Sequence, residues 1–308
     1  MSKLNRRDFV SIGSAIVGAA GLAATSLGER ARAEEAPAAA APSADDQPGK
    51  TPHTRFAVNI EMWWRKLGSY PERIRQAAAL GFPAVEFWPW RGKQLDEIKS
   101  ACDDTGVEIA QFTAWGFVPG MNDPKNLDKF LKEIEASVET AKKLNCKKMT
   151  VVGGNDQPGM TQAEMHQNII DALQRAAPIA AAGEVMLILE PMNIRVDHKG
   201  HCLYGSSDAV RICREVNSPF VKINWDLYHM QISEGDLCGR LREGFDQVGY
   251  LQLADHPGRH EPGTGEIHYN RVLKQAYELG YHGYVGLECN PLASELAAAQ
   301  AVARADVW

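Results

Sequence analysis

The sequence predicts an α/β protein with a single closed barrel of eight parallel strands, each followed by a helix. Short apolar segments and stretches with helical periodicity alternate along the chain after residue 54. This alternation favours a parallel sheet, and eight repeats favour closure into a (β/α)8 barrel over an open sheet. Segment 54–308, about 255 residues long, has the usual length of one such barrel. A second domain is not required.

The elements are predicted from runs of apolar residues that lie between turn signals. The expected strands are Phe56–Asn59, Ala84–Phe87, Glu108–Phe112, Lys148–Val152, Met186–Glu190, Val221–Asp226, Tyr250–Leu253 and Tyr284–Glu288. The expected helices are Pro71–Leu80, Gln94–Asp103, Leu127–Leu144, Ala163–Ala182, Ser207–Val216, Leu237–Phe245, Tyr269–Leu279 and an Ala-rich segment after Leu292. Gly81, Gly106 and Gly280 stand where helices are expected to end, as glycine often does.

The N-terminal segment 1–33 has the features of a twin-arginine export signal. Arg6-Arg7 precedes a weakly apolar stretch from Ile12 to Leu27, and Ala31-Arg32-Ala33 offers a cleavage site. The apolar stretch is too short and too rich in small residues for a membrane span, so no stable membrane anchor is expected. These features predict recognition by the twin-arginine export machinery and a periplasmic or otherwise exported location. A start-site artefact or a retained signal anchor is the alternative.

Other features of the composition bound the architecture and the partners. Segment 34–53 consists largely of Ala, Pro and polar residues, which predicts a disordered linker. A formal net charge of −6 and the lack of a Lys/Arg cluster in 54–308 argue against a nucleic-acid partner. Gly153-Gly154 lacks the spacing of a phosphate loop. The six cysteines show no CxxC pair, so no zinc ribbon is indicated. Disulfide pairing and homo-oligomer formation are left open.

Four polar residues stand at the ends of four predicted strands. Glu190, Asp226, Gln252 and Glu288 belong to the runs MLILE, VKINWD, YLQL and YVGLE. In a parallel barrel these C-terminal ends meet at one mouth, where active sites lie. Any one residue alone is equally consistent with a structural group bonded to backbone amides, but four on successive strands favour a shared site. Carboxylate and amide oxygens suit Mg²⁺ or Mn²⁺ better than a structural zinc, so a divalent metal centre is predicted.

Several motifs point to a known family. They are Arg55–Asn59 (RFAVN), Ala84–Phe87 (AVEF), Leu189–Asn193 (LEPMN), Asp226–Gln231 (DLYHMQ) and the most specific one, Gln252–Ile267 (QLADHPGRHEPGTGEI). With these motifs the chain resembles hydroxypyruvate isomerase, within the larger group of sugar isomerase, sugar epimerase and endonuclease IV-like barrels. That group has the xylose isomerase-like TIM-barrel fold. Epimerase relatives usually carry His at the position of Gln252, which favours the hydroxypyruvate isomerase branch.

The resemblance implies an activity and a ligand set. The activity is a metal-dependent interconversion of an aldose/ketose-type pair, such as hydroxypyruvate and tartronate semialdehyde or a related sugar, by proton transfer through an enediolate. Glu190, Asp226, Gln252 and Glu288 are implied as metal ligands, and Glu190 and Glu288 also as the catalytic acid and base.

Five further residues are candidates for substrate binding. His229 lies in a position that relatives use to contact substrate oxygens, and Arg259 could clasp a substrate carboxylate with two hydrogen bonds. Glu261 and His256 belong to the same loop as Arg259. Trp115 could form an aromatic wall. A structural histidine, a solvated arginine and ordinary rim packing are the alternatives for these residues. Other tryptophans expected near the same end of the barrel are Trp63, Trp64, Trp88 and Trp90.

Three other functions fit the same sequence to different degrees. An epimerase or dehydratase of a keto-sugar or keto-cyclitol would use the same metal and proton abstraction. A non-catalytic exported sugar-binding protein is disfavoured by two carboxylates beside the metal. An endonuclease would need a His-rich zinc cluster and a basic groove, and neither is visible. Because export would expose the protein to free or oxidised sugars, the substrate is left open.

Overall fold

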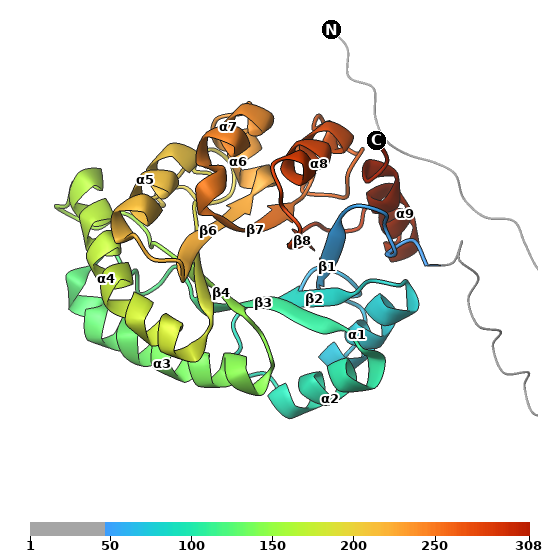
Figure 1. The fold of residues 1–308 in the computed structure, drawn as a ribbon, viewed down its shortest axis with the longest axis horizontal. Helices are drawn as coiled ribbons and strands as arrows, with labels where there is room; N and C mark the ends of the chain where they lie inside the picture. Colours follow the sequence, from blue (N-terminus) through green and yellow to red (C-terminus); the bar gives the residue numbers. More distant parts are fainter. Residues whose placement is uncertain (1–46) are drawn as a thin grey trace, which may run out of the picture. The chain divides into compact units, whose positions relative to one another are not determined.

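The computed structural model describes residues 47–308. Eight parallel strands form a closed barrel in the order β1 to β8, which confirms the predicted fold (Figure 1). The strands are β1 (Arg55–Asn59), β2 (Ala84–Phe87), β3 (Glu108–Trp115), β4 (Lys148–Val152), β5 (Met186–Glu190), β6 (Val221–Asp226), β7 (Val248–Leu253) and β8 (Tyr284–Leu287). All eight coincide with predicted segments, with end shifts of up to three residues.

Helices surround the barrel, and one of them was not predicted. They are α1 (Tyr70–Ala79), α2 (Leu95–Thr105), α3 (Leu127–Lys143), α4 (Gln162–Gly183), α5 (Ser206–Val216), α6 (Leu227–Ser233), α7 (Leu237–Gly244), α8 (Tyr269–Glu278) and α9 (Glu295–Ala305), with short 3₁₀ turns η2 (Pro124–Asn126) and η3 (Phe245–Gln247). Helix α6 follows β6 directly and begins where the Asp226 carboxylate accepts a hydrogen bond from the Tyr228 amide. Its seven residues are too few to show a helical period.

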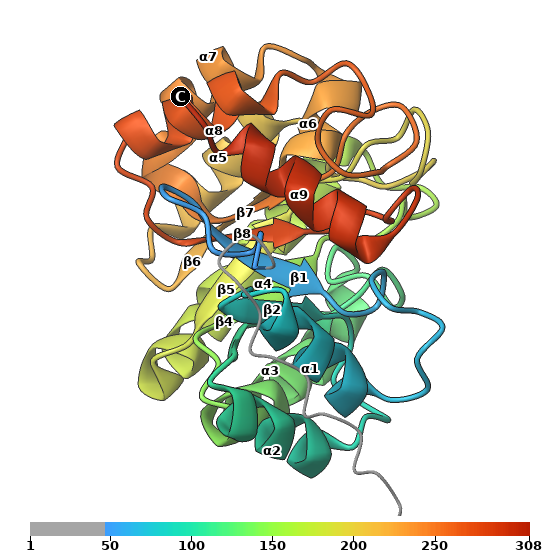
Figure 2. The same ribbon diagram turned by 90° about the vertical axis from the view of Figure 1, so that its right-hand side faces the viewer.

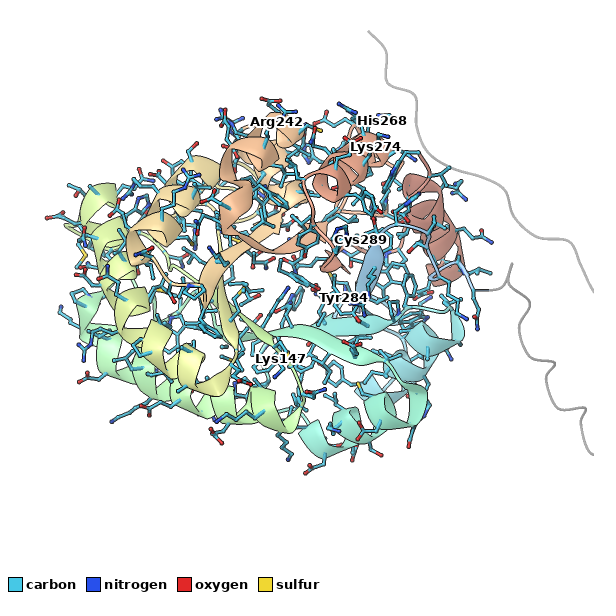
Figure 3. All side chains as sticks on the ribbon, viewed as in Figure 1. Lys147, Arg242, His268, Lys274, Tyr284 and Cys289 are labelled. Carbon is cyan, nitrogen blue, oxygen red and sulfur yellow. The ribbon has the colours of Figure 1, made fainter. Side chains whose placement is uncertain are left out.

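Charged residues of α7 and α8 lie on the outer side of the helical layer. Figure 3 shows Arg242 and Lys274 at the outer edge of the helical layer, while Cys289 lies inside it. All six cysteines are free thiols. Within residues 47–308, no helix combines the length and apolarity needed to cross a bilayer.

Residues 47–53, assigned to the linker from sequence, pack against the barrel. The Gly49 amide donates to the Leu80 carbonyl over 2.8 Å. The His53 amide donates to Asp306 Oδ2 over 2.8 Å, and the His53 ring stacks on Trp308 with ring centroids 4.4 Å apart. Helix α9, which precedes Asp306, lies beside β1 (Figure 2). The predicted export signal and the rest of the predicted linker lie outside the described residues.

The barrel interior changes from apolar to polar toward the C-terminal ends of the strands. A small hydrophobic cluster fills the interior farther from those C-terminal ends, and its members are Ala57, Ala84, Ala110, Ile188 and Tyr250. Because inward side chains recur at every second strand residue, Glu190 follows Ile188 on the interior face of β5 and Gln252 follows Tyr250 on that of β7. The polar groups therefore gather at the mouth where barrel enzymes carry their active sites.

Candidate active site and metal centre

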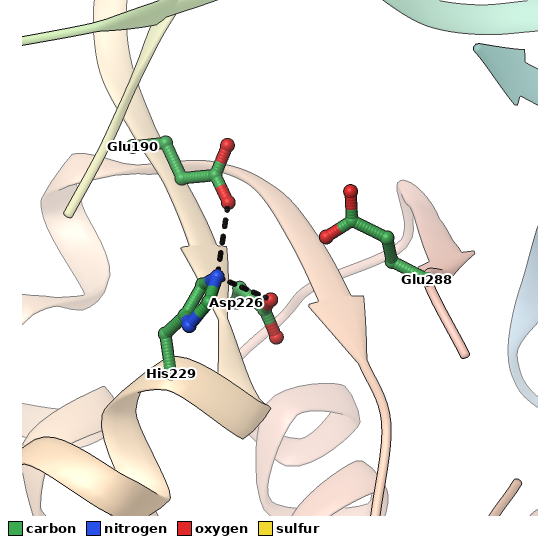
Figure 4. Close-up of side chains that lie close together, drawn as sticks. All are labelled: Glu190, Asp226, His229 and Glu288. Carbon is green, nitrogen blue, oxygen red and sulfur yellow. Dashed lines mark ion pairs between the residues drawn. The ribbon is translucent and has the colours of Figure 1, made fainter. Parts of the chain in front are cut away.

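Four ionisable side chains converge at the C-terminal mouth of the barrel. Glu190 ends β5, Asp226 ends β6, His229 lies in α6 and Glu288 follows β8. One potential ligand atom from each lies within 4.8 Å of the other three, and all four residues are buried (Figure 4). Three of the four predicted metal ligands thus lie together, and His229 joins them.

Gln252, the fourth predicted ligand, lines the same cavity from β7. Its Oε1 accepts a hydrogen bond from Asn224 Nδ2 over 2.6 Å, and its Nε2 donates to Glu86 Oε1 over 2.8 Å. These two contacts define which way the amide points. An amide oxygen has two lone pairs, so Oε1 retains capacity for a cation.

His229 is held by Asn193 in one tautomer. Asn193 Nδ2 lies 2.7 Å from His229 Nδ1 and donates to Asp197 Oδ2 over 2.7 Å. Asn193 Oδ1 accepts hydrogen bonds from the backbone amides of Val196 and Asp197, so the orientation of the Asn193 side-chain amide is fixed. His229 Nδ1 therefore accepts, and burial keeps the ring neutral by lowering its pKa well below the usual value. This hydrogen-bond network assigns the ring proton to Nε2.

The tautomer distinguishes two possible ligand sets. His229 Nε2 faces the cluster, 3.8 Å from Glu190 Oε1 and 3.5 Å from Asp226 Oδ2. A histidine that binds a metal usually donates its other ring N–H to an acceptor, but Asn193 presents a donor there. The arrangement favours Gln252 over His229 as the fourth ligand and leaves the His229 N–H for a substrate oxygen.

The charges of the cluster suit a divalent cation. Asp226 is fully buried, and its Oδ2 has no hydrogen-bond partner among residues 47–308. Burial raises the pKa of Asp226 to about 7, with Arg259 opposing and Glu288 adding to the rise. Burial, followed by Glu288 and Asp226, raises the pKa of Glu190 well above its usual range. Three carboxylates that repel one another, one of them with an oxygen that accepts no hydrogen bond, fit a cation such as Mg²⁺ or Mn²⁺.

Arg259 brings a positively charged side chain to the cavity at the mouth of the barrel. Its guanidinium lies 2.8 Å from Glu288 Oε2 and 3.6 Å from Asp226 Oδ2. The loop that carries it is organised by Asp255, whose carboxylate accepts the backbone amides of Gly263 and Ile267. Arg259 is therefore held at the mouth, where it can contact both the acidic cluster and a substrate.

The cavity beside the cluster has a volume of about 400 Å³ and aromatic walls. Trp88, on the loop after β2, donates its indole N–H to Glu288 Oε1 over 2.6 Å. Phe117 stacks on His198 with ring centroids 4.7 Å apart, and His198 meets the His229 ring edge-on. Phe117 and His198 were not identified from sequence, because loop residues show no periodic signal.

Three predicted substrate contacts lie away from this cavity. Trp115 is buried and packs edge-on against Phe130 of α3, with ring centroids 5.3 Å apart. The Glu261 carboxylate accepts the backbone amide of Leu292. His256 turns its ring toward Tyr228, at 5.9 Å between centroids. None of the three lines the cavity, whereas His229 and Arg259 do.

Glu86, which the sequence motifs included without a role, lies beneath the cluster. This side chain of β2 is fully buried. Its Oε1 accepts from Asn59 Nδ2 over 3.0 Å as well as from Gln252, and its Oε2 accepts from the Tyr250 hydroxyl over 2.8 Å and Gln111 Nε2 over 3.2 Å. Burial, with Glu288 adding to it, raises the pKa of Glu86 to about 7. Its position could have been found from the strand alternation, but its partners come from three other strands, β1, β3 and β7.

Comparison with known proteins agrees with this architecture. The family described as "Xylose isomerase-like TIM barrel" matches residues 74–305. Hydroxypyruvate isomerase of Escherichia coli (strain K12) is 30% identical over 243 residues, covering 77% of this chain and 93% of that protein. The 2-oxo-tetronate isomerase of Cupriavidus necator is 32% identical over 246 residues, covering 78% and 94%.

Solved structures show the same fold. The crystal structure of AP endonuclease, family 2, from Brucella melitensis has a TM-score of 0.75 and 26% identity, and the match covers 80% of this chain and 96% of that one. The apo form of 3-keto-D-glucoside 4-epimerase from E. coli has a TM-score of 0.68 at 24% identity, with coverage of 82% and 98%. The chain therefore belongs to the xylose isomerase-like TIM-barrel family and is an isomerase of its hydroxypyruvate isomerase-like branch.

Proposed function

We propose that this protein is a metal-dependent isomerase that interconverts a hydroxy-ketone and a hydroxy-aldehyde by proton transfer through an enediolate. The observation that carries the proposal is the convergence of the Glu190, Asp226 and Glu288 carboxylates, among which Asp226 Oδ2 accepts no hydrogen bond from residues 47–308. Glu190, Asp226, Gln252 and Glu288 would hold the cation. When bound, a divalent cation polarises a carbonyl and stabilises negative charge on its oxygen.

The protein groups divide the proton chemistry between them. A carboxylate oxygen of Glu190 or Glu288 accepts the proton from the hydroxyl-bearing carbon next to the carbonyl and returns a proton to the former carbonyl carbon, while the other carboxylate carries the hydroxyl proton to the former carbonyl oxygen. The His229 Nε2–H donates a hydrogen bond to a substrate oxygen. The Trp88 and Arg259 contacts to Glu288 fix the orientation of that carboxylate.

Relatives and cavity size together suggest the substrate class. The E. coli and C. necator relatives are named for short oxo acids, hydroxypyruvate and 2-oxo-tetronate, and Arg259 supplies a positive charge for an acid group. At about 30 Å³ for each non-hydrogen atom, the liquid volume of a water molecule, hydroxypyruvate would fill roughly half of the cavity of about 400 Å³. A ketopentose or ketohexose would fill most of it, which supports epimerisation or dehydration of a keto-sugar as the second candidate.

Solvent exchange tests the proposal. The protein is incubated in D₂O with hydroxypyruvate, 2-oxo-tetronate, ketoses and 3-keto-sugars, with Mg²⁺ or Mn²⁺ or with a chelator. An isomerase or epimerase incorporates metal-dependent deuterium at carbon, a dehydratase yields a product lighter by one water, and a binding protein exchanges nothing. In the metal-loaded Glu190→Gln variant, turnover is expected to fall by about 10² or more. Unchanged turnover in that variant would remove Glu190 from the acid/base role.

We also propose that the protein is exported through the twin-arginine pathway. The support is the sequence of residues 1–33 with its arginine pair. Fractionation of cells that make the full chain, beside a variant with both Arg6 and Arg7 changed to Lys, tests this proposal. Export that does not depend on the two arginines would contradict it.

A further inference from the structure

We infer that Glu86 is a positioning residue that orients the carboxamide of Gln252 so that its oxygen, and not its NH₂ group, is available to the metal. This inference rests on the metal site proposed above. The Glu86 carboxylate contacts the NH₂ group of the Gln252 amide, and Asn224 contacts its oxygen.

The contacts of Gln252 leave one orientation for its amide. Glu86 Oε1 accepts from Gln252 Nε2 over 2.8 Å, and Asn224 Nδ2 donates to Gln252 Oε1 over 2.6 Å. In its ionised form the Glu86 carboxylate only accepts hydrogen bonds, and an NH₂ group only donates them. A rotation of the Gln252 amide by half a turn would set oxygen against oxygen at Glu86 and nitrogen against nitrogen at Asn224.

Two chains of hydrogen bonds connect Asn224 to Glu86 and together form a closed ring. In both chains each donor points away from Asn224 and toward Glu86. On one side Asn224 donates to Gln252, which donates to Glu86. On the other side Asn224 Nδ2 donates to the Thr150 hydroxyl over 3.4 Å, Thr150 donates to Gln111 Oε1 over 2.8 Å, and Gln111 Nε2 donates to Glu86 Oε2 over 3.2 Å. Glu86 receives both chains, so its acceptor character sets the direction of every amide in the ring.

The backbone of β8 makes room for this carboxylate. A Cβ atom on Gly286 would come within 2.8 Å of Glu86 Cδ and 2.9 Å of Gln252 Cγ, closer than real Cβ contacts allow. Glu86 and Gln252 therefore occupy the space that a side chain at Gly286 would take. A glycine at this strand position permits the carboxylate and the amide to meet.

Replacement of Glu86 by Gln should release this control. The new NH₂ group could donate to Gln252 Oε1, which permits the Gln252 amide to turn and present its own NH₂ group to the cation. Loss of a residue that orients a metal ligand typically lowers metal affinity by about 10-fold to 100-fold. We expect a rise of this size in the Kd for Mn²⁺ of Glu86→Gln.

A double-mutant cycle separates orientation from the loss of negative charge. The Kd for Mn²⁺ is measured by electron paramagnetic resonance of free Mn²⁺ in the full chain, in Glu86→Gln, in Gln252→Met and in the double variant. If Glu86 acts through the Gln252 oxygen, Glu86→Gln raises Kd in the wild-type background and changes it less than threefold in the Gln252→Met background. Asp306→Asn is the matched control, because it also converts a fully buried carboxylate to an amide, at a residue that bonds the His53 and Thr54 amides. It should lower the melting temperature and leave Kd unchanged.

Each outcome decides between the two proposals. Equal Mn²⁺ affinity of Glu86→Gln and wild type overturns the inference and leaves the proposed metal site intact. An equal loss in both backgrounds also overturns it, since the effect would then be one of charge alone. If wild type itself binds no Mn²⁺, the proposed metal site fails first. Thermal unfolding of each variant confirms that the compared proteins are folded.

Discussion

Replacement of Gly286 by Ala tests how tightly the groups beneath the metal site are packed. The added Cβ would lie 2.8 Å from Glu86 Cδ and 2.9 Å from Gln252 Cγ, whereas carbon atoms pack at about 3.5–4.0 Å. Glu86 Oε2 would lie nearer still, so an overlap of at least roughly 0.7 Å must be relieved by moving two hydrogen-bonded side chains. Overpacking of this kind costs about 1–3 kcal/mol in the free energy of unfolding. For a domain of this size each kcal/mol lowers the melting temperature by about 2–4 °C.

Thermal unfolding beside a glycine control measures this cost. Gly68 has no atom within 4 Å of an added Cβ, and its φ angle lies outside the left-handed range. Gly68→Ala is therefore expected to be neutral or to stabilise by about 0.4–1 kcal/mol through the unfolded state. Gly286→Ala should melt several degrees below wild type and also bind Mn²⁺ more weakly. A Gly286→Ala protein as stable as wild type, with the same Kd, would refute the packing argument.

Three further predictions follow from the electrostatics of the site and of one buried histidine. Long-range ¹H–¹⁵N NMR of the metal-free protein at pH 7.5 should show the proton of His229 on Nε2, and Asn193→Ala should shift it toward a mixture of tautomers; a single Nδ1–H form in wild type would contradict the assignment. Burial lowers the pKa of His201 from 6.5 to about 4. Between these pH values the unfolded chain is protonated at His201 and the folded chain is not, so the free energy of unfolding should fall by about 3 kcal/mol as the pH falls from 6.5 to 4. Urea unfolding of His201→Gln should lose less over the same interval, and an identical loss would rule out this residue as the cause. Removal of the metal with a chelator should lower the stability of the loaded protein by about 2.7 kcal/mol if the free metal was at 100 times its Kd, whereas an unchanged melting temperature would argue against a bound cation.

Fold prediction from this sequence succeeds because each strand carries its own evidence. A run such as MLILE between turn signals is recognisable as a strand without knowledge of its neighbours. Helix α6 was not predicted because Leu227–Ser233 spans only seven residues. Residues 47–53 resemble the linker in composition, but their backbone amides donate hydrogen bonds to the distant residues Leu80 and Asp306, which hold the segment on the barrel.

The candidate site was only partly predictable, since it depends on contacts between strands. The positions of Glu190, Asp226 and Glu288 follow from strand ends that meet in any parallel barrel. That rule does not identify Glu86, because its role comes from hydrogen bonds with side chains of other strands. Trp115 belongs to a strand that ends at the mouth, but its ring packs outward against α3, a direction that composition does not reveal.

An anomalous-scattering crystal structure of the protein with Mn²⁺ tests the central claim most directly. We expect one peak at about 2.1 Å from oxygen atoms of Glu190, Asp226, Gln252 and Glu288, with His229 Nε2 outside the coordination shell. A peak bound by His229 Nε2 with the Gln252 oxygen turned away, or no peak at this mouth of the barrel, would contradict it.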